Sequence, residues 1–148
     1  MKSIREILSG GPVIALPGSA TALEAARKMV EAKVGALLVV DSRSAPLGIF
    51  TERDLMLRVV VALRDPHAVP LQEVMTKNLF IAFPEQRVND VAREMQERHI
   101  RHLPVVERGV VIGMLSLRDL LRAHLSEEHQ EVEVLRAYIQ GEGRPTSL

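Results

Sequence analysis

The sequence predicts an α/β (α+β) protein made of two β-α-β-β-α units, because a short motif and the periodicity around it both occur twice. The motif runs from Gly48 to Leu55 and returns 65 positions later, from Gly113 to Leu120. Both copies read Gly, two apolar residues, a hydroxyl residue, any residue, Arg, Asp and Leu. Two units of this length predict a pseudo-symmetric pair rather than a solenoid.

The repeat extends well beyond this motif. Three further pairs of segments match at offsets of 66 or 67 positions: Ala25–Met29 with Val91–Met95, Leu37–Asp41 with Leu103–Glu107, and Ile4–Ser9 with Leu71–Thr76. The offset changes near Gly10 and again between residues 42–47 and 108–112. Because insertions collect in surface turns, we expect turns at these places.

Periodicity predicts the elements of each unit. Helical spacing of apolar residues predicts helices at 21–31, 53–63, 88–97 and 117–125. Thr21 followed by Glu24 predicts a capping box at the start of the first helix. Short apolar stretches predict buried strands at 13–16, 36–40, 47–50, 79–83, 103–106 and 110–115.

These elements divide the chain into two units with a short connection. Residues 1–63 form the first predicted unit, 64–70 a linker with two prolines, and 71–125 the second unit. Ser126 opens a predicted amphipathic helix at 126–140, with Val132, Leu135, Tyr138 and Ile139 on one face. This face packs either on the parent domain or on a second subunit. Residues 141–148 are predicted to form a mobile tail.

Composition limits the classes of function. The 148 residues carry 19 basic and 19 acidic side chains, a balance that argues against a nucleic-acid or polybasic membrane partner. The chain has no cysteine, which excludes disulfides, thiolate catalysis and cysteine-ligated zinc. No apolar run is long enough to cross a bilayer, and no hydrophobic signal follows Met1. We therefore expect a soluble, cytoplasmic protein.

The paired motifs resemble a tandem of cystathionine-β-synthase (CBS) domains over residues 1–125. The resemblance is carried by the Gly-x-x-Thr-x-x-Asp and Gly-x-x-Ser-x-x-Asp signatures, the 101–106 run, and the openings at 7–9 and 74–76. It implies two β-α-β-β-α units whose sheets pack about a pseudo-twofold axis. It also implies a homodimeric regulatory sensor of adenosine-containing ligands such as AMP, ADP, ATP, S-adenosylmethionine or NAD.

The signature residues suit such a ligand chemically. A carboxylate can accept hydrogen bonds from both ribose hydroxyls, and a hydroxyl residue at a helix start can cap the helix and meet a phosphate. An arginine beside them can pair with phosphate oxygens. The alternative is that the hydroxyls only cap the helices and the carboxylates only complement the helix dipoles. The residues concerned are Thr51, Arg53 and Asp54, and Ser116, Arg118 and Asp119.

The two predicted sites differ in charge. The resemblance implies that adenine lies against the opening strand of the opposite unit, so the second site would gather Ser9, Val13, Ile14, Ala15, Arg101, His102, Leu103, Pro104 and Met114 around Asp119. The first site would gather Lys33, Gly35, Ala36, Thr76, Phe80 and Ile81 around Asp54. Because Arg101 and His102 stand where the first unit has Gly35 and Ala36, we expect phosphates to prefer the second site. The alternative is a solvated helix end at Arg98 and His99.

These observations predict a regulatory role. His99 and His102 lack a third metal ligand, and a His102–Asp119–Ser116 triad would lack a nucleophile elbow. We expect a stand-alone module that binds AMP, ADP or ATP, requires no cofactor, is not an enzyme, and signals to a partner that the sequence does not name. The alternatives are a structural dimerisation module with vestigial sites, or a sensor of S-adenosylmethionine or NAD.

We also expect a homodimer. The helices at 54–63 and 119–125 carry more apolar residues than one short helix face buries within its own unit. The residues expected at the interface are Leu55, Met56, Val59, Val60, Leu120 and Leu121.

Overall fold

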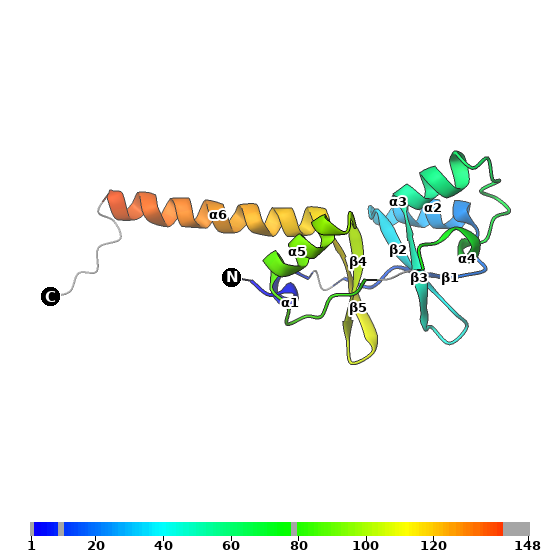
Figure 1. The fold of residues 1–148 in the computed structure, drawn as a ribbon, viewed down its shortest axis with the longest axis horizontal. Coiled ribbons are helices and arrows are strands. Elements are labelled where there is room, and N and C mark those ends of the chain that lie inside the picture. Colours follow the sequence, from blue (N-terminus) through cyan, green and yellow to red (C-terminus); the bar gives the residue numbers. More distant parts are fainter. Residues whose placement is uncertain (1, 9–10, 78–79, 141–148) are drawn as a thin grey trace.

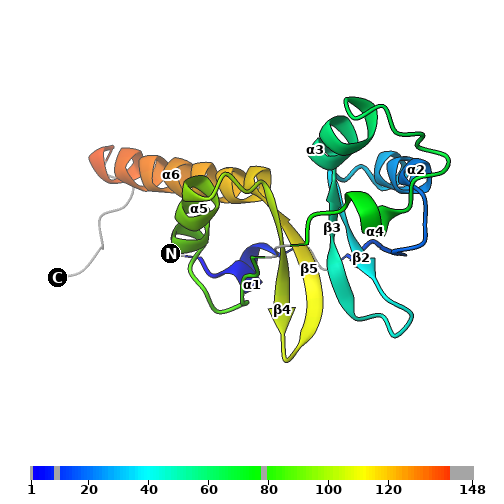
Figure 2. The same cartoon turned by 45° about the vertical axis from the view of Figure 1, so that its right-hand side comes forward.

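A computed structural model describes residues 2–8, 11–77 and 80–140. Two small sheets with their flanking helices lie side by side, and one long helix extends away from them (Figures 1 and 2). The mixed architecture with two related units confirms the predicted fold class. The elements are α1 (Ile4–Ile7), β1 (Ala15–Pro17), α2 (Ala22–Ala32), β2 (Ala36–Val40), β3 (Pro46–Thr51), α3 (Glu52–Asp54), η1 (Leu55–Val60), α4 (Leu71–Val74), α5 (Val88–Glu97), β4 (His102–Glu107), β5 (Val110–Ser116) and α6 (Leu117–Ile139).

The first sheet has the strand order β1-β2-β3. Strand β1 runs parallel to β2, and β2 runs antiparallel to β3 with Leu38 opposite Ile49. Helix α2 connects the two parallel strands and begins with the predicted capping box. The Glu24 N–H donates to Thr21 Oγ1 at 3.2 Å, and the Thr21 N–H donates to Glu24 Oε2 at 3.0 Å. These bonds satisfy two backbone donors that the helix itself leaves free.

Among the residues that the structure describes, the second sheet contains only β4 and β5, so residues 80–83 do not form the strand predicted at 79–83. Leu79 lies outside the described residues, and residues 80–83 contribute a single parallel bridge between Ala82 and Val105. In the first sheet, the Leu38 N–H donates to Ile14 O at 2.9 Å. The equivalent residue in β4 is Pro104, which has no N–H, so the ladder cannot continue there.

The opening segments of the two repeats are exchanged. The Ile4 N–H donates to Gln86 O, and the Val88 N–H donates to Lys2 O, so the first opening pairs with the second repeat. Conversely, the Leu71 N–H donates to Ala20 O at 2.8 Å. This reciprocity is what a pseudo-twofold relation between the repeats requires. The units repeated in sequence, 1–63 and 71–125, therefore differ from the units packed in space.

The two hydrophobic cores follow this exchange. Leu71 and Val74 of α4 are buried in the first core beside Phe50. Ile4 of α1 is buried in the second core beside Val88. Val69, at the end of the predicted linker, also lies in the first core, so that segment contributes to folding as well as to connection.

The glycine that opens each signature lies where the exchanged segment passes closely. A Cβ added to Gly48 would lie 2.4 Å from the backbone oxygen of Thr76. A Cβ added to Gly113 would lie 2.7 Å from Cδ1 of Leu8. Close approach of the exchanged segment, by backbone at Gly48 and by the Leu8 side chain at Gly113, therefore explains why glycine stands at the start of both signatures.

The helix predicted at 53–63 is not a regular α-helix. Only Glu52–Asp54 is α-helical, and Leu55–Val60 forms a π-helical segment in which the Val61 N–H donates to Met56 O at 2.9 Å. Its Val59 side chain is fully buried in the first core. Leu120 is likewise buried in the second core, so the prediction that Val59 and Leu120 form a dimer interface is wrong.

The predicted break before Ser126 is also wrong, because α6 is one continuous helix from Leu117 to Ile139. No proline or glycine interrupts this stretch, and His124 Nε2 lies 3.1 Å from Glu128 Oε1 across the expected boundary. The tail predicted to be mobile, 141–148, falls outside the described residues. Within the part of the chain that is described, no helix has both the length and the apolar character of a membrane span.

Candidate functional site

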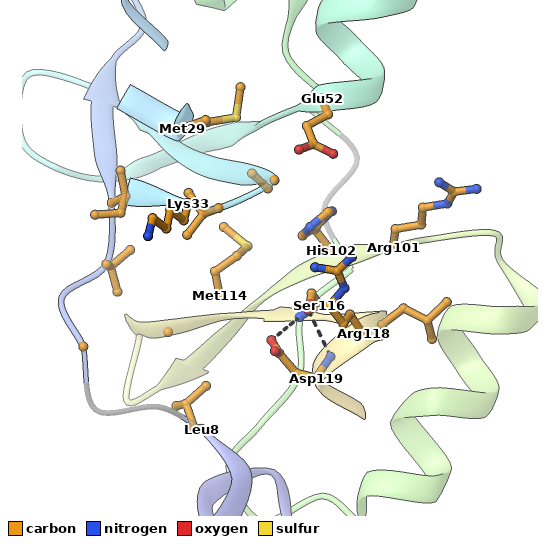
Figure 3. Close-up of a pocket in the computed structure, with 18 of the residues that line it drawn as sticks. Leu8, Met29, Lys33, Glu52, Arg101, His102, Met114, Ser116, Arg118 and Asp119 are labelled. Carbon is orange, nitrogen blue, oxygen red and sulfur yellow. Dashed lines mark hydrogen bonds between the residues drawn. The ribbon is translucent and has the colours of Figure 1, made fainter. Parts of the chain in front are cut away.

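A cavity of about 960 Å³ lies between the two units. Its first wall comes from the segment before β1, the end of α2 and the start of β2. Its second wall comes from the starts of β4 and α6 and from the second half of β5. Figure 3 shows side chains from both walls facing this space.

The second signature forms one edge of the cavity. Strand β5 ends at Ser116 and α6 begins at Leu117, where the Asp119 N–H donates to Ser116 Oγ at 3.1 Å. In return the Ser116 N–H donates to Asp119 Oδ2 at 3.1 Å (Figure 3). Both residues therefore cap the helix, as the alternative reading of the signature predicted. Among the described residues nothing donates to Asp119 Oδ1, so this oxygen remains available to a ligand hydroxyl.

Most residues predicted around Asp119 do line the cavity: Val13, Ile14, Arg101, His102, Met114 and Arg118. Ala15 instead lies in β1 and is not a wall residue. Leu103 and Pro104 are buried in β4 and do not reach the cavity either. Ser9 lies outside the described residues.

The structure places Lys33, Gly35 and Ala36 in this same cavity, although the sequence reasoning assigned them to the site around Asp54. Gly35 faces His102 directly, because a Cβ at Gly35 would lie 3.1 Å from His102 Nε2. The pseudo-twofold relation brings the starts of β2 and β4 to one cavity. Alignment of the repeats shows which residues correspond, but not which residues face one another.

The cavity carries an excess of positive charge. Four cationic side chains, Lys33, Arg101, Arg118 and Arg122, line it together with the two carboxylates Glu52 and Asp119. Within the described part of the chain, none of the four cations forms an ion pair. They are therefore free to attract an anionic ligand without first breaking an internal contact.

His102 lies on the second wall, at the start of β4, and is partly buried. Burial lowers the pKa of His102 below its ordinary value of 6.5 and outweighs the opposite effect of Glu52 and Asp119. Arg101 lowers this pKa further. The Glu52 carboxylate points toward His102 from the start of α3 (Figure 3). A phosphate placed beside His102 would add negative charge and raise this pKa.

Asp54, in the first signature, makes hydrogen bonds and an ion pair within the chain. It is buried, and its Oδ2 accepts from the Thr51 N–H at 3.0 Å and from Thr51 Oγ1 at 3.1 Å. Thr76 Oγ1 lies 3.0 Å from Oδ1 and 3.1 Å from Oδ2, so the predicted proximity of Thr76 and Asp54 is confirmed. Arg58 Nε lies 3.6 Å from Oδ1. Both oxygens therefore have partners within the chain.

Three further residues predicted for the first site are now placed. Arg53 does not line the cavity between the units. Phe80 and Ile81 are exposed, and the Arg98 guanidinium lies 4.0 Å from the centroid of the Phe80 ring. Arg98 Nε also lies 3.2 Å from Glu94 Oε1 one turn earlier in α5, and this ion pair favours the interpretation of Arg98 as part of a helix end.

Sequence reasoning missed several wall residues, among them Glu52, Arg122 and Met29. A signal for Arg122 was present, because it follows Arg118 by four positions and so shares its helix face. Glu52 had no comparable signal, since its counterpart in the second signature is the apolar Leu117. Met29 is also buried in the first core.

Comparison with known proteins agrees with the fold and with the signatures. A sequence model of the CBS domain matches residues 4–61 and 71–126. The mitochondrial CBS domain-containing protein CBSX3 of Arabidopsis thaliana is 36% identical over 125 residues, covering 82% of this chain. The chain spans only 61% of the length of that relative.

Solved structures share the whole arrangement. An uncharacterized conserved protein from Pyrococcus horikoshii has a TM-score of 0.76 and 32% identity, over 82% of this chain and 91% of that one. The CBS domain pair of protein MJ0100, solved with 5-methylthioadenosine and S-adenosyl-L-methionine, has a TM-score of 0.76 and 25% identity over 85% of this chain and 98% of that one. The chain described here therefore belongs to the CBS-domain family and carries a tandem pair of these domains, a regulatory module of signal-transduction proteins.

Proposed function

We propose that this module senses an adenosine-containing ligand, which binds in the cavity between the units with its ribose on Asp119. The observation that carries the proposal is the free Oδ1 of Asp119 at the edge of a cavity of about 960 Å³. A cavity of this size accommodates a nucleotide. The adenosine derivatives bound to the CBS pair of protein MJ0100 support the same ligand class.

Charge favours a phosphorylated ligand, and we infer that AMP, ADP or ATP is preferred over uncharged adenosine. Lys33 and Arg101 lie on opposite walls, so phosphates between them would meet cations from both units. Arg118 and Arg122 add positive charge from α6. Because none of these side chains has a competing ion pair among the described residues, their attraction is available to the ligand.

We infer that one ligand binds per chain. Asp54 holds Thr51, Thr76 and Arg58, and a ribose hydroxyl would have to displace these contacts before it could bind there. Asp119 Oδ1 accepts no hydrogen bond from the described residues, so a ribose hydroxyl can bind it without displacing another contact. The role that follows is regulatory rather than catalytic, since a ligand that touches both units can change how they pack and so signal to a regulated protein.

Self-association is part of this proposal. Met56, Val60 and Leu121 are large apolar side chains that are each more than half exposed, at 57%, 62% and 55%. They lie on the helical segments that follow the two signatures. Exposed apolar side chains of this size are typical of an interface, and we propose that two copies of the chain meet through them.

Replacement of Arg101 by alanine should separate phosphate recognition from adenosine recognition. We expect Arg101→Ala to weaken AMP binding by about tenfold, because one cation beside a phosphate is worth about 1–2 kcal/mol when partly screened. Adenosine affinity should not change. Arg53→Ala is the matched control, because Arg53 lies outside the cavity. Equal losses for AMP and adenosine, or no loss for either, would contradict the charge assignment.

His102 should make AMP binding depend on pH. Bound phosphate raises the pKa of His102 from its lowered value, so the complex takes up a proton that the free protein lacks. Affinity should therefore rise as the pH falls through the pKa that His102 has in the complex, and level off below its pKa in the free protein, which lies below 6.5.

The measurement is AMP titration between pH 7.5 and pH 5. His102→Gln is the control, because it retains the titration of the phosphate itself and removes only that of the imidazole. The same pH dependence in wild type and His102→Gln would show that His102 does not contact phosphate.

A further inference from the structure

The second half of α6 stands clear of the rest of the fold (Figure 1). The start of the helix is anchored in the second core by Leu120 and Ala123. Beyond this anchor, five large apolar side chains are exposed: Leu125, Val132, Val134, Leu135 and Ile139. An isolated helical stretch of this length is marginally stable in water, so these residues require a partner.

The exposed apolar residues of α6 follow a heptad repeat. Counting from Leu121 to Ile139, the positions 121, 125, 128, 132, 135 and 139 are separated alternately by four and three residues. This is the spacing of the a and d positions of a coiled coil, with 125, 132 and 139 at a. Glu128 is the one charged residue in the series. The repeat continues across nearly the whole exposed part of the helix.

The identity of the heptad residues favours a coiled coil of two parallel helices. Val132 and Ile139 are β-branched residues at a, and Leu121 and Leu135 occupy d. In parallel coiled coils this combination favours dimers over higher oligomers. A second copy of the same helix therefore fits the stripe better than an unrelated groove would.

The charges beside the stripe favour the same arrangement. Glu131 stands at a g position, and Arg136 at the e position of the next heptad. In a parallel dimer, a g residue lies beside the e residue five positions later in the partner, so each Glu131 would face an Arg136. In an antiparallel dimer, e residues face e residues, and Arg122, His129 and Arg136 would come together.

We propose that residues 121–139 of α6 form a parallel two-stranded coiled coil with the same helix of a second copy of this chain. The coiled coil covers the apolar stripe and pairs Glu131 with Arg136 in both directions. It extends the self-association surface beyond the two units that enclose the cavity, and only its first two residues, Leu121 and Arg122, also line that cavity.

The absence of cysteine from the chain allows a direct test by cross-linking. In the parallel arrangement Ile139 lies beside Ile139 of the second copy, so Ile139→Cys should form a covalent dimer under mild oxidation. Val134 is equally apolar but stands at an outward c position, so Val134→Cys is the matched control and should remain uncross-linked. Equal cross-linking of both variants, or none of Ile139→Cys, would overturn the proposal.

Charge exchange tests the direction of the helices, with the dimer Kd measured by sedimentation equilibrium. Glu131→Arg and Arg136→Glu should each weaken the dimer by about tenfold, because attractive pairs become repulsive. The double variant should restore wild-type affinity, since the pairs are exchanged but remain complementary. Failure of the double variant to restore affinity would contradict a parallel coiled coil.

The packing of the stripe provides a third measurement. Leu135→Glu should weaken dimerisation at least as much as either charge variant, whereas Val134→Glu should leave the Kd unchanged. Residues 131–139 do not line the cavity, so AMP binding should persist in all these variants. A loss of the coiled coil and a failure of ligand binding are thus distinguished. Equal effects of Leu135→Glu and Val134→Glu would refute the stripe as an interface.

Discussion

Replacement of Asp119 by alanine is expected to weaken AMP binding by about 1.5–3 kcal/mol, or roughly 10- to 150-fold. The physical reason is the loss of a charged acceptor whose Oδ1 is open to the cavity, while Oδ2 is held by the Ser116 N–H. Isothermal titration calorimetry measures this change directly. Asp119→Asn retains an oxygen for the helix cap, so it tests the role of the charge if the alanine variant folds poorly.

Asp54 provides the matched control, because it occupies the same place in the first signature. Asp54→Ala leaves the half-buried donors of Thr51 and Thr76 without their acceptor, so it should lower the free energy of unfolding by about 1–3 kcal/mol. Its folded fraction should still bind AMP. If Asp54→Ala abolished binding while Asp119→Ala bound normally, the roles assigned to the two carboxylates would be reversed.

Replacement of Gly48 by alanine should lower the free energy of unfolding by about 2–3 kcal/mol. The new Cβ would lie 2.4 Å from Thr76 O, and that oxygen accepts from the Ile49 N–H at 3.0 Å. Because the obstacle is backbone, relief of the clash requires the bridge between Ile49 and Thr76 to open. Thermal unfolding should show a decrease in Tm of about 4–12 °C for a chain of this size.

Gly113→Ala is the control for this effect. Its Cβ would meet Cδ1 of Leu8 at 2.7 Å, which is the end of a flexible side chain that can rotate away. We expect a loss of about 1 kcal/mol, near the lower limit for overpacking. A larger decrease in Tm for Gly113→Ala than for Gly48→Ala would show that side-chain packing, rather than backbone approach, selects these glycines.

The repeat was sufficient to predict the fold class, because it located the same elements twice and the helix caps at Thr21, Thr51 and Ser116. It could not show the exchange of the opening segments. The offsets between matching segments are the same whether Ile4 packs on its own repeat or on the other. Only the reciprocal hydrogen bonds, such as Ile4 to Gln86 and Leu71 to Ala20, distinguish these arrangements.

Prediction of the site failed where it depended on that exchange. Thr76 reaches Asp54 from the opposite opening and helps to satisfy a carboxylate that the signature alone presents as free. Lys33 and Gly35 line the cavity beside Asp119 instead of the surroundings of Asp54, because correspondence between repeats does not reveal which wall faces which. Ser116 and Arg118 line the same cavity as Asp119 because they share its strand end and helix start.

The local sequence pattern around Ser126 predicted a helix boundary that α6 does not have. Ser126 followed by Glu127 and Glu128 is a common helix start, but the same residues are tolerated inside a helix when no proline or glycine intervenes. The continuous helix carries the apolar stripe away from the second core. The heptad spacing from Leu121 to Ile139 emerges only when the two predicted helices are joined.

The proposed binding of one adenosine-containing ligand per chain, in the cavity between the units and through Asp119, can be measured by calorimetric titration of the full chain with AMP, ATP, S-adenosylmethionine and NADH. We expect saturable binding of at least one of these ligands with one site per chain, retained in Asp54→Ala and lost or strongly weakened in Asp119→Ala. No binding by any of the four, or binding that Asp119→Ala leaves unchanged, would contradict it and favour a structural dimerisation module.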